Sequence, residues 1–144
     1  MNGDHMRFIS LLILSFACTL ATAKPSQDDH AARVLAIKSQ NTLNDLAALA
    51  GDPQVMRDAS KLKETKAALD ARFLQWPNIA SGPDPWDGYR ACKSALEKAS
   101  YVAELSNMKA TSRLDEKVFL LEKGKLSKLR ADCEWAVKSG GKAG

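Results

Sequence analysis

The sequence predicts an all-α protein, an antiparallel four-helix bundle with up-down-up-down topology, preceded by a cleaved signal peptide. Apolar residues recur three and four positions apart in four segments, which is the periodicity of amphipathic helices. Prolines, glycines and capping residues separate those segments. Cys92 and Cys133 are spaced so that one disulfide joins the third helix to the fourth. No strand-like alternation and no internal repeat compete with this interpretation.

The N-terminus has the pattern of a secretory signal peptide. Arg7 precedes an apolar run from Phe8 to Leu20, and Ala21 and Ala23 supply the small residues that signal peptidase requires. A helix of this length spans roughly 20 Å, less than the hydrocarbon core of about 30 Å, so no transmembrane anchor is expected. We expect residues 1–23 to be removed and residues 24–144 to form one helical domain that is periplasmic or secreted.

Two details of this leader leave alternatives open. Cys18 raises the possibility of a lipoprotein signal, but Phe16 is bulky where a lipobox needs a small residue. Asp4 is unusual in a positively charged leader, so Met6 competes with Met1 as the natural start.

The charge pattern argues against a nucleic-acid partner. The chain of 144 residues has a formal net charge of +4, and removing residues 1–23 takes away one acid and one base, which leaves that charge unchanged. Nucleic-acid binders concentrate their bases in a stripe, whereas lysines and acids alternate here through segments such as LKETKAALDAR. This alternation is typical of a solvated surface.

The first predicted helix spans residues 26–50. Ser26 is its N-cap, two aspartates follow in the first turn, where the helix dipole favours acids, and Gly51 comes just after its end. Its inward stripe consists of Ala32, Leu35, Thr42, Leu46 and Leu49.

The second predicted helix spans residues 53–76, with Asp52 as cap and Pro53 in the first position. Lys66 occupies one stripe position, where its long stem lets the ammonium group reach solvent. The stripe otherwise consists of Val55, Ala59, Leu62, Leu69, Phe73 and Trp76.

A long loop precedes the third predicted helix, which spans residues 85–107. The segment from Trp76 to Gly88 contains three prolines and two glycines, which excludes a helix across it. Asp84 then caps the helix and Pro85 takes its first position. Its stripe consists of Cys92, Ala95 or Leu96, Ala99, and Val102 or Ala103.

The fourth predicted helix spans residues 112–138, with Ser112 as cap and Asp115 in the N3 position. Gly124 is expected to bend or break it, and Gly140 and Gly141 mark its end. Its stripe consists of Leu114, Val118, Leu121, Leu126, Leu129, Cys133 and Ala136.

The cysteines support this layout independently. An exported chain reaches an oxidising compartment, and only Cys92 and Cys133 remain after removal of the leader, so they are expected to pair. Bonded residues of an antiparallel hairpin lie at equal heights, which puts the turn at their midpoint, between Ser112 and Arg113. The capping residues indicate the same turn.

The sequence contains no pattern that specifies a reaction, a metal or a cofactor, and we expect a protein without catalytic activity. His30 is the one histidine after the leader, and no haem-attachment motif is present. Two alternatives remain open: a hydrolase that uses Asp84 with Asp87, and a haem carrier that uses His30 with a methionine, Met56 or Met108. Capping and helix-dipole effects account for both aspartates, and methionines at helical spacing usually belong to a core.

The favoured interpretation is an exported protein-binding module, such as an inhibitor or immunity-type protein of the cell envelope, with another exported or envelope protein as its partner. Trp86, Asp87 and Tyr89 are the candidate binding residues, because aromatic residues beside a charge at a helix start are typical of interfaces. The competing interpretation of the two aromatic residues is that they close the end of the core. The alternative functions are an envelope chaperone or adaptor with an exposed apolar concavity, and a haem- or ligand-carrying bundle.

We predict that the exported protein begins at Lys24 and carries no lipid, because its small-residue cleavage site is better formed than its lipobox. Intact-mass measurement of the exported form tests this. A species that starts at Cys18 with added lipid mass would contradict it.

Overall fold

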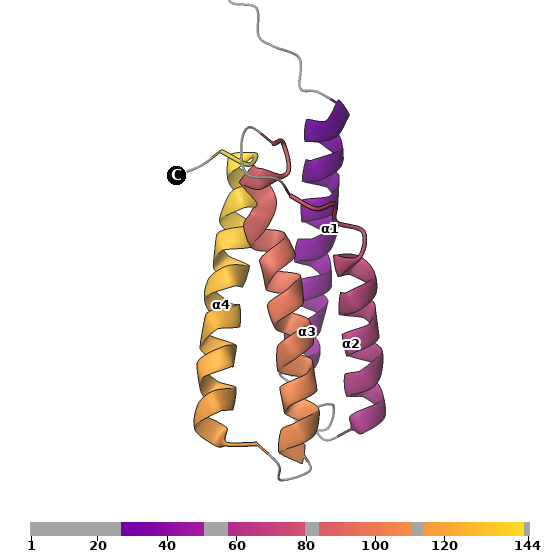
Figure 1. Cartoon of the computed structure of the whole chain (residues 1–144), viewed down its shortest axis with the longest axis vertical. Coiled ribbons are helices and arrows are strands. Elements are labelled where there is room, and N and C mark those ends of the chain that lie inside the picture. The colour runs from indigo at the N-terminus through magenta and orange to yellow at the C-terminus, as the bar shows by residue number, and fades with distance from the viewer. Residues whose placement is uncertain (1–26, 51–57, 80–83, 111–113, 143–144) are drawn as a thin grey trace, which may run out of the picture.

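A computed structural model describes residues 27–50, 58–79, 84–110 and 114–142, and every regular element within these ranges is helical. The helices lie side by side along the long axis of the molecule, and successive α-helices run in opposite directions (Figure 1). The elements are α1 (Gln27–Ala50), α2 (Ala59–Phe73), the 3₁₀ turn η2 (Asp87–Tyr89), α3 (Arg90–Ala110) and α4 (Glu116–Ser139).

The second helix is shorter at both ends than the sequence predicts. Asp58 has extended backbone, and its Oδ1 accepts hydrogen bonds from the amides of Ser60 (3.0 Å) and Lys61 (3.2 Å), so α2 begins at Ala59. The predicted helix is therefore not continuous through Asp58, and its predicted start, with Asp52 and Pro53, lies outside the described residues. Asp58 lies six residues after Asp52, and α2 starts at this second capping aspartate.

At its other end α2 stops at Phe73, and Trp76 lies in the turn that follows. The amides of Gln75 and Trp76 bond back to the carbonyls of Arg72 and Phe73, which ends the helical pattern ahead of Pro77. A residue before proline is restricted to extended conformations, which explains why a helix through Trp76 is excluded.

The third helix begins five residues later than predicted. Asp84 acts as a capping residue, with its Oδ1 accepting from the amide of Trp86 at 2.9 Å, but it starts a tight turn and then η2. The α-helix proper begins at Arg90 and continues to Ala110, past the predicted end at Asn107.

The fourth helix also begins later than predicted. Asp115 is its N-cap and accepts from the amide of Lys117 at 2.8 Å, while Ser112 lies outside the described residues. The helix runs without a break through Gly124 to Ser139, so the expected interruption is wrong. Gly140, in the left-handed conformation with φ of 70°, ends it as predicted.

The inward face of α4 differs from the predicted stripe by one position in its first half. Val118 and Leu121, both expected inside, are 42 % and 59 % exposed, whereas Phe119 and Glu122 are buried. The prediction chose the two apolar residues and passed over Glu122. Glu122 is buried because two lysines neutralise it, which the local pattern does not reveal.

The centre of the core belongs to α3, which packs most extensively against α2 and α4. Its predicted stripe is confirmed by burial, and most of the stripe is alanine, so neighbouring helices approach closely. The main cluster of fully buried side chains consists of Ala32, Leu35, Ala36, Leu43, Leu69, Trp76, Tyr89, Cys92, Ala95, Leu96, Ala99, Ala103, Cys133 and Ala136.

On α1 the buried stripe passes through Ser39 and Leu43, whereas the predicted Thr42 is only half-buried. Ser39 is fully buried because its hydroxyl is satisfied twice: it donates to the carbonyl of Leu35 (2.8 Å) and accepts from the indole nitrogen of Trp76 (3.1 Å). This hydrogen bond joins α1 to the turn after α2 and removes the cost of burying both polar groups.

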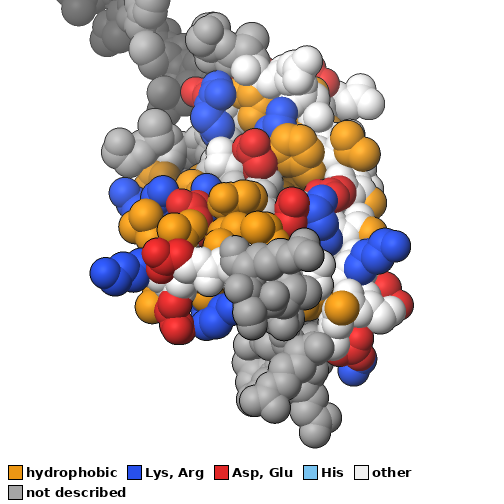
Figure 2. All heavy atoms as spheres, turned by 60° about the horizontal axis from the view of Figure 1, so that its bottom comes forward, with side chains coloured by type: hydrophobic (Ala, Val, Ile, Leu, Met, Phe, Trp, Pro, Cys, Tyr) orange, Lys and Arg blue, Asp and Glu red, His pale blue; other side chains and the backbone are white. Residues whose placement is uncertain are grey.

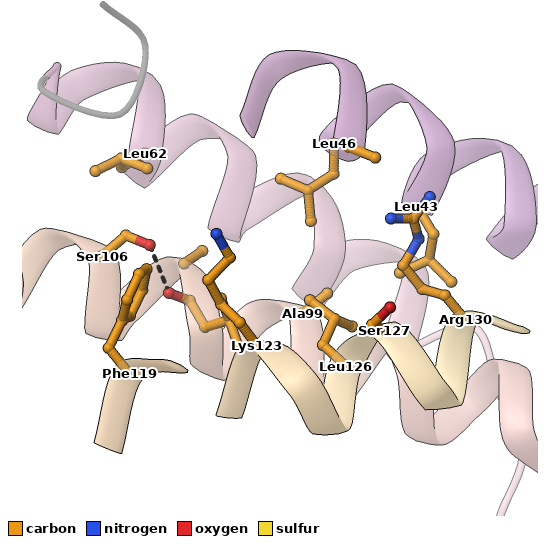
Figure 3. Close-up of a pocket in the computed structure, with 13 residues that line it drawn as sticks. Leu43, Leu46, Leu62, Ala99, Ser106, Phe119, Lys123, Leu126, Ser127 and Arg130 are labelled. Carbon is orange, nitrogen blue, oxygen red and sulfur yellow. Dashed lines mark hydrogen bonds between the residues drawn. The ribbon is translucent and has the colours of Figure 1, made fainter. Parts of the chain in front are cut away.

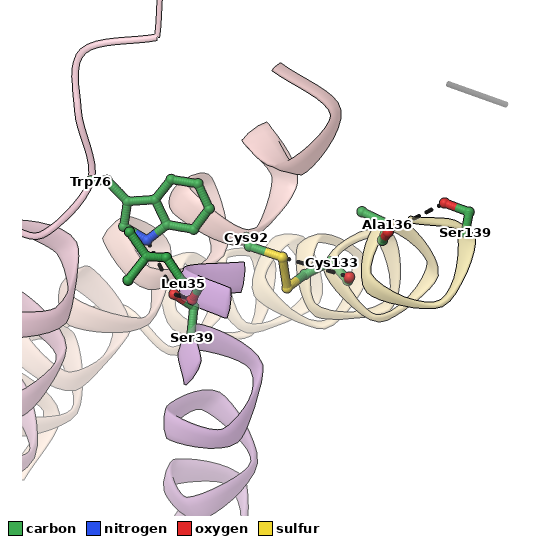
Figure 4. Close-up of a disulfide and its surroundings, with 7 residues drawn as sticks. All are labelled: Leu35, Ser39, Trp76, Cys92, Cys133, Ala136 and Ser139. Carbon is green, nitrogen blue, oxygen red and sulfur yellow. Dashed lines mark hydrogen bonds between the residues drawn. A yellow bond between two sulfur atoms is a disulfide. The ribbon is translucent and has the colours of Figure 1, made fainter. Parts of the chain in front are cut away.

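A disulfide joins the first turn of α3 to the last turns of α4, as predicted (Figure 4). The Sγ atoms of Cys92 and Cys133 lie 2.07 Å apart and their Cα atoms 4.5 Å apart. The reversal between the helices falls between Ala110 and Glu116, which includes the predicted midpoint.

A close backbone contact seals the same end of the molecule. A Cβ added to Gly88 would lie 2.0 Å from the carbonyl oxygen of Gly141, so only glycine fits there. The ring of Tyr89 lies beneath Gly141 and is 4 % exposed. These contacts hold η2 against the C-terminal end of α4.

The predicted signal peptide lies outside the described residues. Among the helices that are described, none is both long enough and apolar enough to cross a bilayer.

We predict that replacing both Cys92 and Cys133 by alanine lowers the free energy of unfolding by about 2–4 kcal/mol, because the bridge closes a long loop between α3 and α4. Denaturant titration of both proteins measures this. Thiol labelling of the denatured, unreduced wild-type chain is the control, and two reactive thiols would contradict the bridge.

Candidate binding site

An apolar groove with a volume of about 370 Å³ lies among all four α-helices. Side chains of α1 and α2 form one side and those of α4 the other, with α3 between them (Figure 3). The lining consists of Leu43, Leu46, Ala47, Leu62, Ala99, Val102, Ala103, Ser106, Phe119, Lys123, Leu126, Ser127 and Arg130.

The groove exists because short side chains occupy several of the facing positions. Ala47, Ala99 and Ala103 cannot reach across the space that Leu43, Leu62 and Phe119 hold open. The hydroxyl of Ser106 donates to the carbonyl of Val102 at 2.8 Å, so its only proton is already committed within α3. The interior of the groove therefore offers mainly apolar contacts.

Two positively charged side chains of α4 line the groove. Lys123 is exposed, and its ammonium lies 5.5 Å from the centroid of the Phe119 ring. Arg130 reaches across to α1 beside Leu43 (Figure 3), where its Nη2 donates to Oδ1 of Asn44 at 3.4 Å. The Nε of Arg130 is buried and has no hydrogen-bond partner among the described residues.

The buried acid of α4 serves the structure. Glu122 accepts from Lys125 at 2.7 Å and from Lys98 of α3 at 2.6 Å. These hydrogen bonds, that of Lys125 foremost, hold the pKa of the Glu122 carboxyl below its ordinary value. The carboxylate thus ties α3 to α4 through its hydrogen bond with Lys98.

A second acidic centre ties α2 to α3. Asp70 accepts from Lys66 at 2.6 Å and from the hydroxyl of Ser100, and these bonds lower the pKa of its carboxyl. Lys66, predicted to extend from the apolar stripe to solvent, is partly exposed and forms this ion pair.

The structure gives the three candidate binding residues different surroundings. Tyr89 is buried, which raises the pKa of its hydroxyl. Trp86 is half-buried, with its ring edge-on to Trp76 at a centroid distance of 5.8 Å. Asp87 is exposed and pairs with Arg90 at 2.7 Å. Asp87 and part of Trp86 therefore reach the surface, and Tyr89 supports the core.

The geometry does not favour the two alternative sites, a hydrolase pair of Asp84 with Asp87 and a haem site of His30 with a methionine. Asp84 is engaged with the amide of Trp86 and Asp87 with Arg90, so both act in the turn before α3. His30 lies in the first turn of α1 and Met108 in the last turn of α3, at opposite ends of helices that run in the same direction (Figure 1). Met56 lies outside the described residues.

Large apolar side chains are exposed on α4, which the predicted stripe did not anticipate. Leu120 is 57 %, Leu121 59 % and Trp135 49 % exposed. Figure 2 shows apolar side chains gathered on the side where α4 lies in Figure 1, with both charges at their edges. The inward-facing series Phe119, Glu122, Leu126, Leu129 and Cys133 repeats at three and four residues, and this repeat was the available signal that Leu120, Leu121 and Trp135 point outward.

No group of three or more potential metal ligands occurs in the part of the chain that the structure describes. Comparison with protein-family models, with curated proteins and with solved structures finds no match.

We predict that Trp86→Ala lowers the free energy of unfolding by about 2 kcal/mol, roughly half the cost at a fully buried tryptophan, because its ring packs on Trp76. Thermal and denaturant unfolding measure the change. Asp87→Asn, which removes only an exposed ion pair, is the control and is expected to cost less than about 1 kcal/mol. An unchanged melting temperature for Trp86→Ala would contradict the packing role and favour a binding role.

Proposed function

We propose that this chain is an exported protein with the up-down-up-down topology of a four-helix bundle, and that it acts by binding another exported or envelope protein. The signal-peptide pattern supports export, and the bonded geometry of Cys92 and Cys133 suits an oxidising compartment. A rigid, disulfide-braced surface suits an inhibitor or immunity-type role.

The observation that carries the proposal is the exposed apolar surface of α4. We call it the α4 outer face and define it by Leu120, Leu121, Gly124, Ala131 and Trp135, all exposed. The spacings of four, seven and four from Leu120 to Trp135 place these residues along one side of the helix. They extend over roughly 22 Å of helix, a length that suits a standard protein interface.

The shape of the α4 outer face also suits contact with a partner protein. Nothing lies within 4 Å of a Cβ added to Gly124, so the space beside it is open. Leucines on one side of this gap and Trp135 beyond it can enclose a partner's side chain or backbone. Tryptophan is among the residues that contribute most to binding energy at interfaces.

The charges beside the face indicate an acidic partner. Lys117 and Lys128 are exposed near it and form no ion pair within the described ranges, and the exposed Asp132 offsets only one of these two charges. A second copy of this chain would bring the same lysines toward one another, which disfavours self-association. We therefore expect a different protein with an apolar centre and an acidic rim.

The alternative is an envelope chaperone or adaptor, which the apolar groove favours. Such a protein would bind several unfolded clients weakly, whereas an inhibitor or immunity-type protein would bind one partner tightly. Titration against the captured partner and against an unfolded, disulfide-reduced client distinguishes these outcomes.

We predict that Trp135→Ala weakens binding to the partner by at least about tenfold and leaves the melting temperature nearly unchanged, since Trp135 is half-exposed in the free chain. The partner is captured from the source cell's envelope fraction, identified by mass spectrometry and then titrated in purified form. Leu74→Ala is the matched control, because Leu74 is 79 % exposed but lies after α2. Equal affinity for Trp135→Ala and wild type would remove the α4 outer face from the interface.

A further inference from the structure

We infer that the groove among the four α-helices binds a long-chain monocarboxylate, with its alkyl chain along the apolar lining and its carboxylate at Arg130. This inference is independent of the proposed protein interface. The groove uses the side of α4 that carries Phe119 and Leu126, whereas the α4 outer face lies around Leu121 and Trp135.

The size and lining of the groove favour a small apolar ligand. Its volume of about 370 Å³ lies at the lower end of the range for small-molecule sites, which are concave and mostly apolar with a few placed polar groups. From Phe119 to Arg130 the α4 wall extends for roughly 16 Å, so the groove is elongated along the helix. An alkyl chain matches this shape better than a compact ring system does.

One end of the groove has the charge that such a ligand needs. Arg130 reaches from α4 to α1, and its Nε, which is buried, lacks a hydrogen-bond acceptor among the described residues. An unsatisfied buried donor is costly, and a guanidinium binds carboxylates through two parallel hydrogen bonds. Because this Nε has almost no accessible surface, a ligand carboxylate would bind the terminal Nη atoms of Arg130 and would reach Nε only after the side chain shifts.

Arg130 lies between the apolar groove and a more polar cavity. A second cavity of about 210 Å³ adjoins the groove and shares Leu43, Ser127 and Arg130 with it. Its other lining residues are mostly polar and include Gln40, Asn44 and Glu134. Glu134 is paired with Lys138 at 2.6 Å, so its charge is already partly neutralised. A carboxylate at Arg130 would therefore be solvated while the alkyl chain stays buried.

Lys123 gives the groove a second positive charge near Leu62 and Leu46 (Figure 3). It is exposed and contacts the Phe119 ring, so it assists the approach of an anion but does not hold one in a buried position. Arg130 is therefore the group on which headgroup recognition depends.

The first test uses the wild-type protein with its disulfide intact. Calorimetric titration with palmitic acid below its aggregation concentration is expected to give one site per chain, and binding should raise the melting temperature. Palmitic acid methyl ester, which has the same chain without the charge, is expected to bind at least about tenfold more weakly. Absence of palmitic acid binding, or equal binding of acid and ester, would overturn the inference.

The second test locates the site. Arg130→Gln is expected to weaken palmitic acid binding roughly ten- to a hundredfold and to leave ester binding unchanged, because only the charged headgroup uses the guanidinium. Lys128→Gln, on the solvent side of the same helix, removes an equal charge and is expected to change neither. Equal losses in the two variants would show that net charge alone matters and would overturn the assignment to Arg130.

Ala47→Leu fills the groove from α1 and is expected to abolish binding of acid and ester alike. Circular dichroism and the melting temperature establish that each variant is folded. Unchanged binding in folded Ala47→Leu would place the ligand elsewhere. Vesicles of anionic phospholipid form a last arm, in which binding to vesicles without binding to the free acid would make the ligand a lipid surface and overturn the inference.

Discussion

The close approach of α3 and α4 at the Cys92–Cys133 bridge is the constraint on which the rest of the structure depends. The Cα atoms of the two cysteines lie 4.5 Å apart, so the backbones of α3 and α4 face each other closely at the bridge and small side chains are favoured beside it. Ala95, Ala99 and Ala136 meet that requirement and are buried. The bridge also brings the end of α4 onto η2, where two glycine backbones touch.

The groove forms because α3 and α4 are farther apart at the ends remote from the disulfide. Figure 1 shows α3 and α4 drawing apart toward their other ends. There Val102, Leu105 and Phe119 form a second, smaller cluster of buried residues, with Leu114 and Leu126 packed against it. Large residues keep the helices apart while Ala47 and Ala103 leave the intervening space unfilled, so the same chain has a tight end and a hollow end.

Polar groups hold this arrangement in register at sites where apolar packing alone would allow sliding. Ser39 receives the Trp76 indole, Glu122 receives two lysines, and Asp70 receives Lys66 and Ser100. Each group has at least one partner outside its own helix, namely Trp76 for Ser39, Lys98 for Glu122 and Ser100 for Asp70, so these hydrogen bonds favour one alignment of the helices. These residues therefore account for specificity of the fold and leave Arg130, with its unsatisfied Nε, as the exception at the groove.

The two proposed sites lie on different sides of α4. Its inward side packs in the core, and Glu116 and Glu122 form ion pairs with lysines of α3. The α4 outer face has exposed apolar side chains with lysines near them. The other site has the Arg130 guanidinium at one end of the apolar groove. The protein surface and the groove share no residue, and Ala131 of the outer face also borders the cavity beside Arg130.

The sequence by itself determined the helical class, the paired cysteines, the capping role of Asp84 and the glycine that ends α4, because spacing, capping and chain turns are local properties. Only the tertiary structure decided the burial of Glu122 on the inward side of α4, since Lys98 of α3 pairs with it there. It likewise decided the burial of Tyr89 beneath Gly141 and the groove itself. Those features depend on contacts between residues remote in the chain, and no periodicity within one helix records the size or charge of its neighbours.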